Sequence, residues 1–180
     1  LVAGAFALLV GLGVAFRQSL RRARRDAARI EQLAHYDSLT GLANRSLLGD
    51  RLDLMIAMAH RNAGPMAILL FDLDGLKGVN DTLGHAAGDR LLQEVARRLT
   101  ERLRDGDTVA RLGGDEFTVI LEDVGSLEAV EAMAREILLA FSRPLEVDER
   151  HDVNITPSLG ISLYPDHALV PTDLLKSADT

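Results

Sequence analysis

The feature that most constrains the fold is an unbroken apolar run, MAILLF at residues 66–71, which leads directly into two acidic residues, Asp72 and Asp74. An apolar stretch of this length without polar alternation is typical of a strand buried on both faces. The run therefore predicts a central strand of a sheet, with acidic side chains placed at its end.

Helical and strand periods alternate around this run. Helices are predicted over residues 46–60, 86–104 and 127–141, a hairpin over 108–121 turning at Gly113-Gly114, and a strand pair at 145–148 and 152–163. Paired glycines supply the positive φ that a tight turn needs, and Pro157 hints at an edge strand or a bulge. The predicted fold class is α/β (α+β): a central mixed or antiparallel sheet flanked by helices, with an N-terminal helix.

Charge and composition exclude several function classes. The formal net charge of −7 disfavours a broad nucleic-acid-binding surface, and the absence of cysteine excludes disulfides and thiolate metal sites. The sequence has neither the Gly-x-x-x-x-Gly-Lys-[Ser/Thr] phosphate loop nor a Ser/His/Asp or His-based zinc spacing. A small anionic ligand could still be held through a metal ion.

Residues 1–16 carry no charge and are followed by an arginine cluster that begins at Arg17. This order is the reverse of a secretory signal peptide and is typical of a membrane helix entering the cytoplasm. The run is shorter than the ~20 residues that span a bilayer, and a buried core helix is the alternative. We interpret residues 1–16 as the end of a transmembrane helix and expect the next domain on the cytoplasmic side of the inner membrane.

The Arg- and Ala-rich stretch 17–36 places apolar residues at heptad spacing for little more than two heptads (Leu20, Ala23, Ala27, Ile30 and Ala34). The pattern predicts a linker helix that could pair with a second copy as a coiled coil, and a solvated charged helix is the alternative.

Two acidic clusters carry candidate chemistry. Asp72 at the end of a buried strand is rigidly placed, as coordination of a divalent metal requires, although such an acid can also simply cap the next turn. The hairpin turn adds Asp115 and Glu116 beside two glycines that let a bulky ligand approach the backbone. Carboxylates from two strands would then converge on a metal, an arrangement suited to Mg²⁺ and a triphosphate.

A polar, glycine-punctuated stretch, residues 80–89, lies between the clusters. An Asn and an Asp in this stretch could select guanine, because a carboxylate can accept hydrogen bonds from guanine N1 and N2 and adenine offers no equivalent donor pair. A capped helix start with two turn glycines is the alternative.

Four segments, in order, resemble the signatures of the GGDEF family of diguanylate cyclases: DSLTGLANR at 37–45, FDLDGLKGVNDTLGHAAGDRLL at 71–92, RLGGDEF at 111–117 and SLG at 158–160. The resemblance covers roughly residues 35–180. It implies a fold like that of nucleotidyl cyclases and polymerase palms. It also implies a nucleotidyltransferase that condenses two GTP molecules into cyclic di-GMP and two pyrophosphates across a homodimer.

The resemblance also implies roles for individual residues. Asp72, the Leu73 carbonyl and Asp115 would bind Mg²⁺ or Mn²⁺, and Lys77 would steady phosphate charge. Asn80, His85 and Asp89 would contact the nucleotide, Gly113 and Gly114 would admit the triphosphate, and Asp115 or Glu116 would help deprotonate the ribose 3′-hydroxyl.

Arg104 and Asp107 match the family's Arg-x-x-Asp product-inhibition site, where a plain surface ion pair is the alternative.

Leu76 stands where the family more often has Phe. The family continues beyond residues 176–179 with a helix that grips the triphosphate, so we expect a domain over 37–180 that is truncated and less active. A phosphodiesterase domain following in a GGDEF-EAL parent is plausible. The alternative function is a catalytically weak or degenerate domain that binds GTP or cyclic di-GMP and thereby regulates this downstream phosphodiesterase domain.

Overall fold

The structure is a computed structural model that describes residues 2–62, 64–148 and 151–179, with the side chains of residues 2–16, 27, 28 and 62 outside that description. The chain divides into two units, Leu1–His35 and Tyr36–Thr180. Each unit is described by itself.

The first unit is a single helix, α1 (Val2–His35), which contains both the apolar run and the arginine cluster. Leu20, Ile30 and Leu33 are exposed on this helix. Among the residues that the structure describes, no helix is both long and apolar enough to cross a membrane. The transmembrane prediction for residues 1–16 concerns side chains outside the described set.

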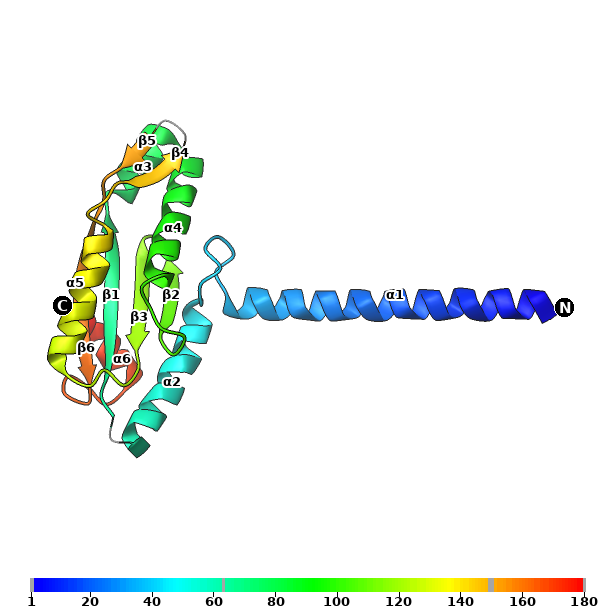
Figure 1. Ribbon diagram of the computed structural model, residues 1–180, viewed down its shortest axis with the longest axis horizontal. Coiled ribbons are helices and arrows are strands. Elements are labelled where there is room, and N and C mark those ends of the chain that lie inside the picture. Colours follow the sequence, from blue (N-terminus) through cyan, green and yellow to red (C-terminus); the bar gives the residue numbers. More distant parts are fainter. Residues whose placement is uncertain (1, 63, 149–150, 180) are drawn as a thin grey trace. The chain divides into compact units, whose positions relative to one another are not determined.

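The second unit alternates helices and strands (Figure 1). In chain order these are α2 (Arg45–Asn62), β1 (Met66–Asp74), α3 (Leu76–Leu83), α4 (His85–Thr100), β2 (Thr108–Gly113), β3 (Glu116–Leu121), α5 (Leu127–Ala140), β4 (Leu145–Asp148), β5 (His151–Val153), β6 (Thr156–Tyr164) and α6 (Pro171–Ala178).

The main sheet has the strand order β2-β3-β1-β6 and every pairing in it is antiparallel. The apolar run at residues 66–71 thus lies in a central strand, as predicted. Alternate residues of β1 enter two separate cores: Ala67, Leu69 and Phe71 pack with α4 and α5, and Met66 and Ile68 pack with α2 and α6. The predicted fold class, an antiparallel sheet flanked by helices, is confirmed.

The prediction of one strand over residues 152–163 was wrong. β5 pairs only with β4, in a small second sheet, and β6 then joins β1 at the edge of the main sheet. The chain passes between the sheets at Asn154 and Ile155, where the Ile155 side chain enters the α4/α5 core. Pro157 lies in β6, an edge strand, where a missing N–H need not interrupt the ladder.

Two short helices escaped prediction, and one predicted helix was too long. α3 and α6 span eight residues each, about two turns, which is too short for an amphipathic pattern to stand out. α4 ends at Thr100 instead of residue 104, and turns lead from it to β2.

Candidate functional site

Strand register places two acidic side chains next to each other at one end of the sheet. Asp72 of β1 lies directly opposite Glu116 of β3, and Phe71 lies opposite Phe117. Both phenylalanines are buried in the α4/α5 core, so the two carboxylates must point to the other face of the sheet. Directly opposed residues have Cβ atoms about 4.5–5.5 Å apart, so one small ligand can contact both acids.

Asp115 occupies the turn that precedes Glu116. Gly113 and Gly114 take φ values of 141° and 55°, in the left-handed region that favours glycine, and the β2–β3 pairing is shifted between Arg111 and Gly113. A shifted register of this kind re-aims the side chains near a turn. Glu116 is the direct cross-strand neighbour of Asp72, and Asp115 is the residue that precedes it in the turn.

Ser158 of β6 flanks Asp72 on the other side, because the two residues are also directly opposed. The Ser158 hydroxyl donates a hydrogen bond of 3.2 Å to Asp74 Oδ2. Within the described part of the chain, the carboxylates of Asp72, Asp115 and Glu116 have no hydrogen-bond or ion-pair partner. Their oxygens are available to a ligand.

An arginine ties the turn to the segment that follows α1. The Arg111 guanidinium donates to the Gly114 carbonyl from Nε and Nη2, at 3.1 and 2.7 Å, and to both Asp37 oxygens at 3.1 and 3.3 Å. Asp37 also accepts from the Thr40 amide and hydroxyl at 2.9 and 2.6 Å. We call these residues (Asp37, Thr40, Arg111 and Gly114) the hairpin clamp.

The clamp alters the proton affinity of Asp37. Burial alone would raise the pKa of its carboxyl, but the hydrogen bonds from Thr40 and the hydrogen bond and charge of Arg111 together outweigh burial and hold the pKa below its usual range. Asp37 and Arg111 lie in two of the segments that resemble the family's signatures, but the sequence assigns neither residue a role, because nothing in it shows that positions 74 residues apart meet.

The residues predicted to bind nucleotide lie on two consecutive helices after β1. Lys77 is exposed in the first turn of α3, Asn80 is half-buried further along it, and His85 and Asp89 are exposed in the first two turns of α4. β1 ends at Asp74 and α3 begins at Leu76, so Lys77 lies in the first turn of the helix that leaves the acidic end of the sheet.

Arg104 and Asp107 line a separate cleft of about 350 Å³ together with Tyr36 and Arg51. The Asp107 carboxylate accepts from the Arg104 and Glu122 backbone amides at 3.0 and 3.3 Å. Among the described residues the two side chains form no ion pair, so the surface ion pair suggested as an alternative is not present.

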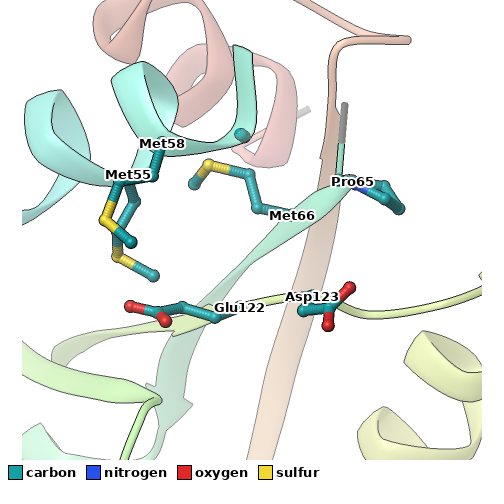
Figure 2. Close-up of a pocket in the computed structure, with 8 residues that line it drawn as sticks. Met55, Met58, Pro65, Met66, Glu122 and Asp123 are labelled. Carbon is teal, nitrogen blue, oxygen red and sulfur yellow. The ribbon is translucent and has the colours of Figure 1, made fainter. Parts of the chain in front are cut away.

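A further cavity of about 240 Å³ lies at the opposite end of β1 from Asp72. Figure 2 shows Met55, Met58 and Met66 around it, with Glu122 and Asp123 at its edge. None of the predicted site residues lines it.

The described residues at the acidic end of the sheet offer fewer side-chain ligands than a metal site built from protein alone needs. Among the described residues, no group of three or more His, Cys, Asp or Glu side chains is placed to hold a metal. Mg²⁺ is commonly bound by one or two carboxylates with substrate phosphates and water completing its shell, and the acids around Asp72 fit that pattern.

Comparison with known proteins agrees with the fold and the motifs. The family described as "Diguanylate cyclase, GGDEF domain" matches residues 34–180. The bifunctional diguanylate cyclase/cyclic di-GMP phosphodiesterase MucR of Pseudomonas aeruginosa is 44% identical over 161 residues, which are 89% of this chain and 23% of that protein. The diguanylate cyclase TpbB of the same species is 39% identical over 158 residues, 88% of this chain and 36% of that protein. The chain therefore spans well under half the length of these relatives.

Solved structures give the same result. The GGDEF domain of TpbB superimposes with a TM-score of 0.78 at 41% identity, covering 81% of this chain and 84% of that one. The coiled coil and GGDEF domain of DgcB from Caulobacter crescentus, in complex with c-di-GMP, gives a TM-score of 0.80 at 27% identity, covering 95% of this chain and 90% of that one. The chain therefore belongs to the GGDEF family of diguanylate cyclase domains.

Proposed function

We propose that residues 36–180 form a cyclase domain that joins two GTP molecules into cyclic di-GMP and releases two pyrophosphates. The observation that carries the proposal is the cross-strand pair of Asp72 and Glu116, with Asp115 beside it in a glycine turn. These three acids lie at the end of a sheet where their side chains have no protein partner among the described residues.

The domain would hold a divalent metal, Mg²⁺ or Mn²⁺, through Asp72, Asp115 and the backbone carbonyl of Leu73. When bound, the metal would neutralise charge on the triphosphate and help to orient it. Lys77, in the first turn of α3, would add positive charge against the phosphates. Gly113 and Gly114 have no side chains that would keep the triphosphate from the turn.

Guanine would be bound by Asn80 and Asp89, with His85 near the nucleotide. Asp115 or Glu116 would accept the proton of the ribose 3′-hydroxyl. That oxygen then forms a bond to the α-phosphorus of the GTP held by the partner copy, and the bond from this phosphorus to pyrophosphate breaks. In the same way, the 3′-oxygen of the partner's GTP attacks the α-phosphorus of the GTP held by this copy, which closes the ring and releases the second pyrophosphate. Each copy therefore contributes half of the site.

Two further proposals concern the whole protein. The exposed Leu20 and Ile30 on α1 support pairing of two copies through this helix. The uncharged residues 1–16 followed by arginines support attachment to the inner membrane with the cyclase domain in the cytoplasm.

Arg104 and Asp107 would form a site for the product. Their shared cleft and the open Arg104 guanidinium support binding of a guanine edge, since arginine can donate to O6 and N7 together. Product bound there would slow further synthesis.

The test is incubation of the purified chain with GTP and Mg²⁺, followed by chromatography of the products. We expect cyclic di-GMP and pyrophosphate in a 1:2 ratio, and neither product after chelation of the metal. GTP binding without turnover, in a version extended at its C-terminus as well, would contradict catalysis and favour a regulatory nucleotide-binding domain.

A further inference from the structure

Gly88 of α4 lies directly against the side chain of Asn80 on α3. A Cβ atom built on Gly88 would be 2.0 Å from Asn80 Oδ1, 2.9 Å from its Cγ and 3.3 Å from its Nδ2. The first two distances are below any normal carbon contact. The Asn80 amide therefore occupies the space that any other residue at position 88 would fill.

The turn between the two helices creates this contact. The Gly84 amide donates to the Asn80 carbonyl at 3.0 Å, and the Ala87 and Gly88 amides donate to the Gly84 carbonyl at 3.0 and 3.3 Å. α4 therefore starts close against α3, with Ala87 and Gly88 buried at the contact. This packing brings Asn80 to the backbone of the residue that precedes Asp89.

Within the described part of the chain, the Asn80 side-chain amide makes no hydrogen bond to the protein. The space left by Gly88 admits the Asn80 amide, and the donor and acceptor of this amide remain open to a ligand. An amide that packs against the backbone while its polar atoms stay unused is well suited to recognise a base.

We propose that Gly88 is a positioning residue for guanine recognition: by lacking a side chain it lets the Asn80 amide lie against the backbone of the residue that precedes Asp89. This inference rests on the proposed function, in which Asn80 and Asp89 bind the guanine of GTP. Gly88 itself touches no substrate.

The test variant is Gly88→Ala. Gly88 has no positive φ, alanine is a better helix former, and the atoms in the way belong to the end of a flexible side chain. We therefore expect an unchanged or higher Tm together with weaker substrate binding. The KM for GTP should rise about tenfold with kcat nearly unchanged, as for the loss of one hydrogen bond made equally in the ground and transition states. The NMR signals of the Asn80 side-chain amide should also shift in the nucleotide-free protein.

Gly49→Ala is the matched control. Gly49 also lies within a helix, α2, and a Cβ there meets nothing within 4 Å. It gains the same helix propensity and should leave the KM unchanged.

A double-mutant cycle separates positioning from general packing. In the Asn80→Ala background, where the obstructing amide is gone, adding Gly88→Ala should not raise the KM further. Additive effects, or a Gly88→Ala protein with the GTP affinity of the wild type, would overturn the inference and leave the proposed function intact. A wild-type protein that binds no GTP would overturn both.

Misfolding of Gly88→Ala would also be informative. If the clash with Asn80 is the cause, the double variant must fold. If the double variant also misfolds, Gly88 serves the fold alone and the positioning role is refuted.

Discussion

Phe71 and Phe117 determine where the acids beside them point. Both phenylalanines are buried, and each is next to an acidic residue in the sequence: Phe71 precedes Asp72, and Phe117 follows Glu116. Because side chains alternate along a strand, burying the aromatic residues holds both acids on the opposite face. Packing in the core thus determines the direction in which the acidic side chains at the ends of β1 and β3 point.

Asp72→Asn should abolish most cyclase activity while leaving the fold intact. Asp72 is exposed and makes no hydrogen bond or ion pair among the described residues, so its replacement costs little stability. Loss of a carboxylate ligand should reduce the initial rate of cyclic di-GMP formation by about 100-fold or more. Asp50→Asn, an exposed acid on α2, is the control and should retain the full rate. An active Asp72→Asn protein would be incompatible with the proposed metal site.

Asp37 should make the stability of the domain depend on acid pH. Its pKa is lower in the folded state than the ordinary value of 3.8, so the unfolded chain binds the proton more readily. The stabilisation from the clamp is therefore fully present above pH 3.8, and it is lost as the pH falls through the pKa that Asp37 has in the folded state. Urea unfolding of wild type and Asp37→Asn should show a free-energy difference at pH 6 that shrinks between pH 4 and pH 2. A difference independent of pH would contradict the ion pair.

At the scale of elements, the helices and strands that could be predicted from the sequence are those with a clear local pattern of apolar residues or turn glycines. The unbroken run at 66–71 and the paired glycines predicted β1 and the β2–β3 hairpin, because each depends on local chemistry. The partners of β5 and β6 could not be predicted, since period-two patterns do not say which sheet a strand joins. The hairpin clamp was also missed, because it depends on a contact between segments far apart in the sequence.

Arg98 should be important for attaching α4 to the end of α5. Its guanidinium is largely buried and donates to the carbonyls of Ala140, Arg143 and Pro144 at 2.8, 2.7 and 2.6 Å. Arg98→Ala leaves these acceptors without their donor, which should cost about 1–3 kcal/mol and lower Tm by about 2–10 °C.

Arg135→Ala provides the comparison for that measurement by differential scanning calorimetry. Arg135 forms an exposed i,i+4 pair with Glu131 at 3.2 Å, and such pairs contribute little. Equal Tm values for the two variants would show that the Arg98 contacts do not stabilise the domain.

Arg104→Ala should relieve product inhibition without slowing the first turnovers. Arg104 lies in the cleft with Asp107, away from the acidic pair at the sheet end, so the variant should keep the initial rate. Added cyclic di-GMP should inhibit it at least about tenfold less than wild type, as expected for losing a bidentate contact to guanine. Identical inhibition curves would remove Arg104 from the product site.

At the scale of the whole molecule, catalysis should depend on encounters between copies. If each domain holds one GTP, the rate per chain should rise with protein concentration until pairing is complete. Initial rates measured over a hundredfold range of dilution, beside sedimentation velocity, test this. A constant rate per chain, at concentrations where only monomers sediment, would contradict a shared site.

The alternation along β3 also limits which insertions and deletions this sheet end can tolerate. Removing Asp115 or Glu116 would delete one of the acids outright, and inserting one residue between Glu116 and Phe117 would turn Glu116 toward the buried side occupied by α4 and α5, where an ionised carboxylate is costly. Inserting two residues there would restore the orientation of Glu116 but move it out of its position opposite Asp72. Changes of length should therefore be accepted between α4 and β2, and rejected between the turn glycines and Phe117.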